Sequence, residues 1–154
     1  MPQFRDSLPE GTRVFESRLQ VQWADVDIAG IMYFANYWRF AEYAEMEMFR
    51  ELGLPFDSLF DDLDFWLPRV RAEADYYAPA LMGDWIRMRA HLEKVGASSV
   101  RFRIVMFNER TGIPMASLVL TVAAMDRRTK KSMPLPARVR DVLLTCLPAR
   151  GESG

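Results

Sequence analysis

The sequence contains a single cysteine, a single histidine and no long uninterrupted apolar run. One cysteine excludes an internal disulfide and suits a reducing compartment. Cys146 also lies in an apolar C-terminal stretch, which favours a packed thiol over a nucleophile. The apolar runs are too short to span a bilayer, and the charged N-terminus lacks the apolar region of a secretory signal. We therefore expect a cytoplasmic protein without an integral membrane segment.

An excess of charge of one sign is missing as well, because the formal net charge is -1 over 154 residues. This balance gives no electrostatic basis for nucleic-acid binding. The length fits one domain, residues 1–154, with a core of about 14–145 and no internal repeat. A chain of this size can bury a core without disulfides or a structural metal.

Apolar residues alternate in several segments and recur at helical spacing in one. Alternation predicts strands near residues 18–23, 67–77, 85–94, 99–107 and 115–125. Helical spacing predicts a helix of about five turns with Asn36 as its N-cap and Gly53 at its end. Its apolar face comprises Tyr37, Phe40, Ala41, Ala44, Met48 and Leu52. A short helix is expected near Pro136, and residues 1–12 and 148–154 are expected to be loose ends.

The predicted order is one strand, one long helix and then four consecutive strands. The simplest way to bury both apolar faces is an α+β fold in which a curved antiparallel sheet wraps around the central helix. The outer face of that sheet also carries apolar residues, among them Trp85, Val105 and Val119. These residues favour association with another copy, so we expect a homodimer or homotetramer with its active site near the subunit boundary.

Two aspartates occur where the first strand gives way to the long helix, in the stretch from Trp23 to Tyr43. A carboxylate beside apolar groups costs solvation free energy unless a partner or a reaction uses it. Asp27 could stabilise a turn by bonding a nearby backbone N–H, or it could be a catalytic group. For Asp25 we favour a structural role.

The stretch "DVDIAGIMYFANYWRFAEYAEMEMFRELG" resembles the signature of the hotdog-fold acyl-CoA thioesterases. The branch is typified by 4-hydroxybenzoyl-CoA thioesterase and the Tol–Pal-associated thioesterase. Its pattern, D-x-D-x-x-G-x-x-[FWY]-x-x-x-Y, is matched by Asp25, Asp27, Gly30, Tyr33 and Tyr37. The segments "YAPALMGD", "KVGASSVRF" and "MDRRTKKSMPLP" support the resemblance, which covers about residues 14–145 and implies a hotdog fold.

The resemblance implies hydrolysis of an acyl-CoA to the free acid and CoA, with an aryl or a short-to-medium acyl group. Asp27 matches the catalytic carboxylate, as nucleophile or general base, and Phe34 matches the residue whose backbone N–H holds the thioester oxygen. Gly30 and Tyr33 are expected to contact the substrate. A thiol with a pKa near ~8.5 leaves without a strong acid, so one aspartate and the free N–H groups of a helix N-terminus can suffice.

A basic cluster near the C-terminus and a turn between two strands could bind the rest of CoA. Arg127, Arg128, Lys130 and Lys131 could hold its phosphates, or could simply be a solvated hairpin end. Likewise, Lys94, Ser98 and Ser99 could bind the pantetheine or the phosphates of CoA, or could have only a structural role. His91 is expected on the outer face of the sheet. We expect no metal and no redox cofactor.

Two alternatives remain beside the acyl-CoA thioesterase. The first is a thioesterase that acts on acyl carrier protein. The second is a non-catalytic hotdog protein that binds an acyl thioester or serves as an assembly subunit. The presence of Asp27 argues against the second.

Overall fold

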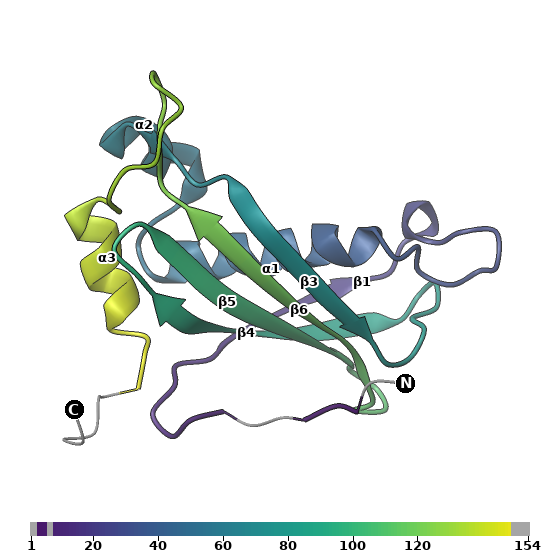
Figure 1. Cartoon of the computed structure of the whole chain (residues 1–154). Helices are drawn as coiled ribbons and strands as arrows, with labels where there is room; N and C mark the ends of the chain where they lie inside the picture. Colours follow the sequence, from purple (N-terminus) through teal and green to yellow (C-terminus); the bar gives the residue numbers. More distant parts are fainter. Residues whose placement is uncertain (1–2, 6–7, 149–154) are drawn as a thin grey trace.

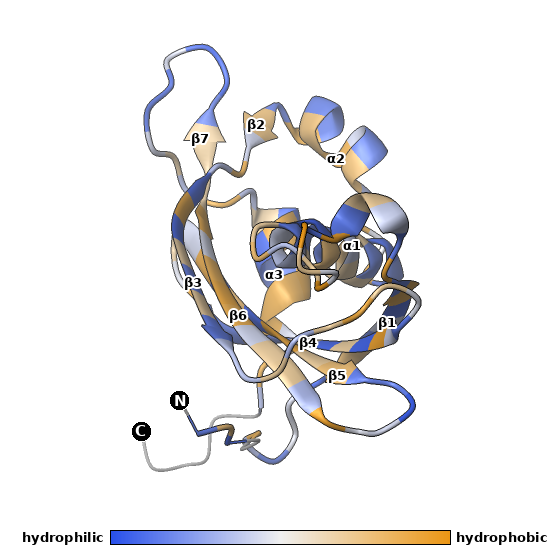
Figure 2. Ribbon diagram, turned by 90° about the vertical axis from the view of Figure 1, so that its right-hand side faces the viewer, coloured by the Kyte–Doolittle hydropathy of each residue, from blue (hydrophilic) through white to orange (hydrophobic). Residues whose placement is uncertain are grey.

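The computed structural model describes residues 3–5 and 8–148, and in it a five-stranded antiparallel sheet curves around one long helix (Figures 1 and 2). The sheet order is β1-β4-β5-β6-β3. A separate two-stranded pair joins β2 to β7. The strand bounds are β1 Phe15–Gln20, β2 Phe65–Trp66, β3 Arg69–Tyr76, β4 Trp85–Val95, β5 Ser99–Asn108, β6 Pro114–Ala123 and β7 Met125–Asp126. The predicted sheet wrapped around a helix is therefore confirmed.

The central helix, α1, spans Asn36–Glu51 and buries the apolar face that its sequence predicts. The side chains of Phe40, Ala41 and Met48 are inaccessible to solvent. Asn36 is the first helical residue rather than the cap, which corrects the prediction by one position. Its side-chain amide instead donates to the backbone carbonyl of Asp25 at 2.9 Å, so it ties the helix to the preceding loop.

The register of the sheet places one row of buried apolar side chains from each of the strands β4, β5 and β6 on the face toward α1. In β4 and β5, for example, Met88 lies opposite Met106 and Ala90 opposite Ile104, and all four are buried. The alternation read from the sequence thus gives the correct inward face. The short helix α3, Ala137–Leu144, is also present and buries Val139 and Leu143.

Two short helical segments were not predicted. Helix α2 spans Phe56–Leu63, a segment for which the sequence predicts no helix. Residues Trp23–Asp25 form a 3-10 turn, so the extended segment ends at Gln20 rather than continuing to Trp23. Both segments lie at junctions of α1, one before its start and one after its end.

The N-terminal segment packs on the outer face of the sheet, although a loose end was expected (Figure 1). The ring of Phe4 meets Tyr77 and Phe107 edge-on, with centroids 5.5 and 5.7 Å apart. The N–H of Arg13 donates to the carbonyl of Cys146 at 3.2 Å, which links the segment before β1 to the residues just after the last helix, Ala137–Leu144. The expectation of a loose end at 149–154 falls outside the described residues.

The outer face of the sheet leaves less apolar surface than the sequence suggested. Val105 and Val119 are buried within the chain itself, and Val105 lines a hollow beneath the N-terminal segment. The guanidinium of Arg18 covers the ring of Trp85 at 3.8 Å. These three residues therefore no longer argue for self-association, and an argument for a dimer has to come from elsewhere.

Within the described residues, none of the helices combines the length and the apolar composition that crossing a membrane would require.

Candidate active site

The loop between β1 and α1 is folded by its own backbone bonds. The N–H of Asp27 donates to the carbonyl of Ile31 at 2.9 Å, and the N–H of Gly30 donates to the carbonyl of Asp27 at 3.0 Å. Gly30 has a φ of 78°, a left-handed conformation that glycine adopts without a steric penalty. The loop therefore turns tightly between Asp27 and Gly30, with Asp27 as the first residue of the turn.

Asp25, and not Asp27, is the buried carboxylate of this junction, with 3% of its surface exposed. Its carboxylate accepts the N–H of Gln22 at 2.8 Å and pairs with Arg39. Its backbone carbonyl accepts the N–H of Tyr33 at 2.9 Å and the side chain of Asn36. Asp25 thus holds the loop onto the first turns of α1, which agrees with the structural role favoured from the sequence.

Asp27 is exposed in the single chain, so the picture of a carboxylate inside an apolar junction is wrong for this residue. Its Oδ1 accepts the N–H of Ala29 at 2.8 Å, which is the turn bond considered as the alternative to catalysis. Oδ2 accepts no hydrogen bond from any residue that the structure describes. The turn bond orients the carboxylate and leaves one oxygen available, so the two roles are compatible.

The N–H of Phe34 has no acceptor among the described residues, and it lies in the turn that leads into α1. Free N–H groups at the start of a helix, together with the helix dipole, favour negative charge. The carbonyl of Phe34 is fixed from the other side, because it accepts the hydroxyl of Tyr76 at 3.0 Å. The ring of Tyr33 lies edge-on to that of Phe34, and both rings are exposed.

A mostly apolar hollow of about 270 Å3 opens beside Phe34. Tyr37 and Tyr76 line it and meet edge-on with their centroids 5.0 Å apart. Burial raises the pKa of both phenols, so both stay protonated at neutral pH and can donate hydrogen bonds. The hollow can hold an uncharged group next to the Phe34 N–H.

The basic cluster lies in the turn after β7, at the end of the molecule away from the loop that carries Asp27 (Figure 1). Arg127 donates to Asp61 at 2.9 Å, and Lys130 lies 4.1 Å above the ring of Trp66. Arg128 and Lys131 are exposed and form no ion pair within the described residues. Two of the four basic side chains therefore contact other residues of the chain, and the other two form no ion pair within the described residues.

Lys94 lies near the end of β4, Ser98 in the turn that joins β4 to β5, and Ser99 at the start of β5, and this end of the strands is also far from Asp27. Its backbone is largely used within the chain: the carbonyl of Ser98 accepts the N–H of Ala124 at 2.7 Å, and that of Gly96 accepts Arg140 at 3.1 Å. Within one chain the structure does not bring these residues, or the basic cluster, next to Asp27.

The remaining reactive side chains lie away from this loop. Burial raises the pKa of the Cys146 thiol, which disfavours the thiolate that a nucleophile requires. His91 is buried on the outer face of the sheet, opposite Arg103 on the neighbouring strand. Both placements agree with the structural roles expected for these residues.

Sequence reasoning also missed the ion pair of a buried glutamate. The carboxylate of Glu45 on α1 is 1% exposed and pairs with Arg69 at the start of β3. A signal was present, because Glu45 falls four residues after Ala41 and three before Met48, on the apolar face of the helix. A carboxylate at such a position needs a partner or a function.

A sheet wrapped around one helix, with an exposed carboxylate and an unbonded N–H in one loop, is an arrangement that can hydrolyse a thioester, and comparison with known proteins identifies the family. Residues 21–143 match the thioesterase-like superfamily, and the chain belongs to that family. A 1,4-dihydroxy-2-naphthoyl-CoA hydrolase of Synechococcus elongatus is 30% identical over 124 residues, which cover 80% of this chain and 90% of that protein. A putative esterase of Aquifex aeolicus is 25% identical over 129 residues, with 84% and 97% covered.

Among solved structures, a 1,4-dihydroxy-2-naphthoyl-CoA thioesterase from Synechocystis superposes with a TM-score of 0.79 at 23% identity. The match covers 86% of this chain and 96% of that one. The predicted hotdog fold is therefore confirmed, and the chain is a thioesterase of this fold class.

Proposed function

We propose that this chain hydrolyses the thioester of an aromatic acyl-CoA, with Asp27 as nucleophile or general base. One observation carries the proposal: Asp27 offers a free, exposed carboxylate oxygen in the loop that also presents the unbonded N–H of Phe34. The similarity to a hydrolase of 1,4-dihydroxy-2-naphthoyl-CoA supports an aromatic acyl group over an aliphatic one.

The proposed chemistry uses few groups. The thioester oxygen accepts the N–H of Phe34, and the developing oxyanion is further stabilised by the N-terminal end of α1. The Oδ2 of Asp27 attacks the carbonyl carbon or deprotonates a water molecule that does so. CoA then leaves as a thiolate, which requires no strong acid because thiols ionise near pH ~8.5. In the nucleophilic variant, water hydrolyses the resulting anhydride and regenerates the carboxylate.

A panel of acyl thioesters tests this function, with thiol release as the readout. The panel contains aromatic, short-chain and medium-chain acyl-CoAs and the same acyl groups on acyl carrier protein. We expect the highest kcat/KM for an aromatic acyl-CoA. A preference for the carrier protein or for an aliphatic chain would contradict the proposed substrate, and activity on none would favour a binding protein.

We further propose that the active unit is a homodimer formed through β3. This strand is at the edge of the sheet, and an unpaired edge is a surface that proteins normally cover. Apolar side chains are exposed along and beside it, including Val70 at 60% and Phe34 at 60%. A two-fold axis pairs a strand with its own copy in antiparallel orientation. In such a dimer, the start of the partner's β3 lies beside Tyr76, which is bonded to Phe34.

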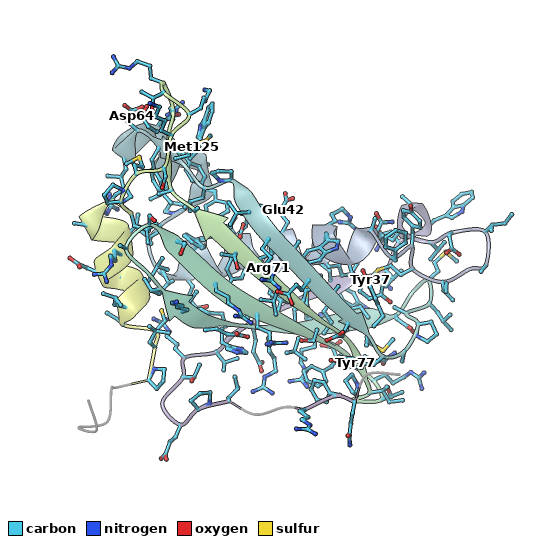
Figure 3. All side chains as sticks on the ribbon, viewed as in Figure 1. Tyr37, Glu42, Asp64, Arg71, Tyr77 and Met125 are labelled. Carbon is cyan, nitrogen blue, oxygen red and sulfur yellow. The ribbon has the colours of Figure 1, made fainter. Side chains whose placement is uncertain are left out.

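This arrangement would bring the partner's basic turn to the end of the molecule that carries Asp27. The charges of β3 suit it, because Arg71, Glu73 and Asp75 form its outward row (Figure 3 labels Arg71). A two-fold axis at Ala72 sets each Arg71 opposite the partner's Glu73. Opposite charges facing each other across strands are favourable, and like charges are not.

The dimer makes a charge-reversal prediction. Arg71→Glu is expected to dissociate the dimer, because two like charges then face each other in each of the two symmetric contacts. The Arg71→Glu/Glu73→Arg double variant is expected to restore it, because the pairs are re-formed with the signs exchanged. Sedimentation at micromolar concentration measures the state. A wild-type protein that is monomeric and fully active would contradict the dimer.

The basic turn makes a kinetic prediction. Neutralising Arg127, Arg128, Lys130 and Lys131 together is expected to raise KM for acyl-CoA more than it lowers kcat, because phosphate contacts bind ground and transition states alike. Added salt should raise KM of the wild type as well.

Two paired variants refine that result. Neutralising only Arg128 and Lys131 should reproduce most of the rise in KM, because these two side chains are free. Neutralising only Arg127 and Lys130, which already contact Asp61 and Trp66, should do less. An unchanged KM in the fourfold variant would mean that the cluster is a solvated turn.

A further inference from the structure

A further hollow, of about 400 Å3, opens between α1, α2 and the segment that leads into β3. Its walls are mainly apolar and include Met46, Phe56, Phe60 and Trp66. Glu42, on the exposed side of α1, and Met125 also line it and are labelled in Figure 3. Arg69 completes the lining on the side of β3. An apolar hollow with a few polar groups is the form that binding sites for small molecules usually take.

Arg69 reaches this hollow because β3 has a bulge at its start. Arg69 lies opposite Val122 of β6, whereas Arg71 lies opposite Thr121, so Val70 is an extra residue in the strand. Val122 belongs to the core, and Arg69 therefore shares the face of the sheet that looks toward α1. Bulges re-aim side chains in this way and are frequent next to functional sites.

The partner of Arg69 is costly to bury. Glu45 is 1% exposed, and burial raises the pKa of its carboxyl despite the nearby guanidinium. Its Oε2 is buried and has no hydrogen-bond partner in the described chain. Arg69, at 39%, is partly exposed toward the hollow. Stability does not explain a buried ion pair with an unsatisfied oxygen, so the pair indicates a binding role for Arg69.

We propose that Arg69, held in place by Glu45, is a specificity-determining residue that donates a hydrogen bond to a hydroxyl oxygen on the aromatic acyl group. The hollow holds the aromatic rings, and the thioester lies at Asp27 of the partner subunit, whose loop adjoins the start of β3 in the proposed dimer. This inference rests on the proposed function.

The charges around Arg69 select a neutral substituent at its guanidinium, whereas Arg127 and Lys130 lie over the ring of Trp66, another wall of the hollow. The guanidinium of Arg69 is already balanced by Glu45, and Glu42 adds a second carboxylate. The three groups together carry a formal charge of about -1, which repels a ring carboxylate. A hydroxyl oxygen accepts from the guanidinium without adding charge, and an unsubstituted ring leaves that donor unused.

Three substrates that share one ring system test the proposal: 2-naphthoyl-CoA and its hydroxylated and carboxylated derivatives. For the wild type we expect kcat/KM to be highest for the hydroxyl derivative and lowest for the carboxyl derivative. Arg69→Met should lower kcat/KM for the hydroxyl derivative by about 10–100-fold, the value of a hydrogen bond to a charged group. It should change the value for the unsubstituted substrate only slightly.

Glu45 acts through Arg69, so its variant has a different signature. Glu45→Gln keeps the shape and removes one negative charge, so the carboxyl derivative should be accepted better while the preference for hydroxyl weakens. Arg101→Met, which removes an ion-paired arginine on the outer face of the sheet, is the control and should leave all three ratios unchanged. The Glu45→Leu/Arg69→Leu double variant removes both charges together and should lose the preference without leaving a buried charge unpaired.

The outcomes separate the two proposals. If the wild type hydrolyses none of the three substrates, the proposed function fails. If it hydrolyses them without preferring the hydroxyl derivative, or if Arg69→Met keeps that preference, the function stands and the role of Arg69 is overturned. Should Arg69→Met not fold, the Glu45→Leu/Arg69→Leu variant takes its place, and a hydroxyl preference retained in that variant overturns the role of Arg69.

Discussion

Replacing Asp27 by asparagine is expected to lower kcat for thioester hydrolysis by about 10²-fold or more, the scale of a positioned acid–base group. The amide has no basic or nucleophilic oxygen, so either proposed role of the carboxylate is lost. Affinity for acyl-CoA should survive, because the change is nearly isosteric and removes a negative charge near the acyl group. kcat, affinity and thermal midpoint are measured on one sample.

The geometry of the turn sharpens this prediction. In the Asp27→Asn variant the amide oxygen can still accept the N–H of Ala29, so the free energy of unfolding should change by no more than about 0.5 kcal/mol. Asp84→Asn is the matched control, because Asp84 accepts the N–H of Leu81 at 2.9 Å in the neighbouring loop. The control should keep normal kcat. Near-normal kcat in the Asp27 variant would rule out a catalytic role for Asp27 and most of the mechanism.

Most of the fold could be predicted because local pattern and tertiary burial agree. Residues such as Phe40 and Met48 recur at helical spacing and are buried, and Met88 alternates with the polar residues Arg87 and Arg89 and is buried as well. Helix α2 was missed although Phe56, Leu59, Phe60 and Leu63 also have helical spacing. The charged "DDLD" stretch at its end is more typical of a loop than of a helix, and it outweighs that pattern in the sequence.

The site was harder to predict, because burial at a junction does not follow from a short motif. Asp25 and Asp27 are two residues apart, yet one is buried in a network and the other is exposed. The 3-10 turn decides this, since it directs Asp25 toward Arg39 and Gln22. The N-terminal segment likewise covers part of the outer face, so Val105 gave a misleading argument for self-association.

The bulge at Val70 is the least predictable feature of the candidate site. Strict alternation would place Arg69 and Arg71 on the same outward face of β3, where both would be ordinary surface arginines. One inserted residue turns Arg69 toward α1, where it meets Glu45. No residue type in the segment "LPRVRAEADY" marks the insertion, so the pair became visible only in the structure.

The same pair gives the second large effect, this time on stability. Arg69→Leu is expected to lower the free energy of unfolding by about 3 kcal/mol at neutral pH, because it leaves the buried Glu45 carboxylate without its counterion. The Glu45→Leu/Arg69→Leu double variant should instead be as stable as the wild type or more stable by about 1–2 kcal/mol. We expect the low end of that gain, because Arg69 is partly exposed and little desolvation cost is recovered when its charge is removed.

The pH dependence supplies the check. Burial already raises the pKa of Glu45, so the native state binds this proton more tightly than the unfolded chain does, and this contribution to stability falls as pH rises through the native pKa. Loss of Arg69 raises that pKa further, so the contribution of Glu45 to stability decreases over a wider range of pH. The free energy of unfolding, measured with denaturant at about pH 5 and about pH 8, should therefore decrease between these two pH values by more in Arg69→Leu than in the wild type. The decrease should be smallest in the double variant. An equal decrease in all three proteins would contradict this prediction. It would mean that Arg69→Leu does not leave an ionised Glu45 carboxylate without a counterion, and that the charges of the pair do not affect stability.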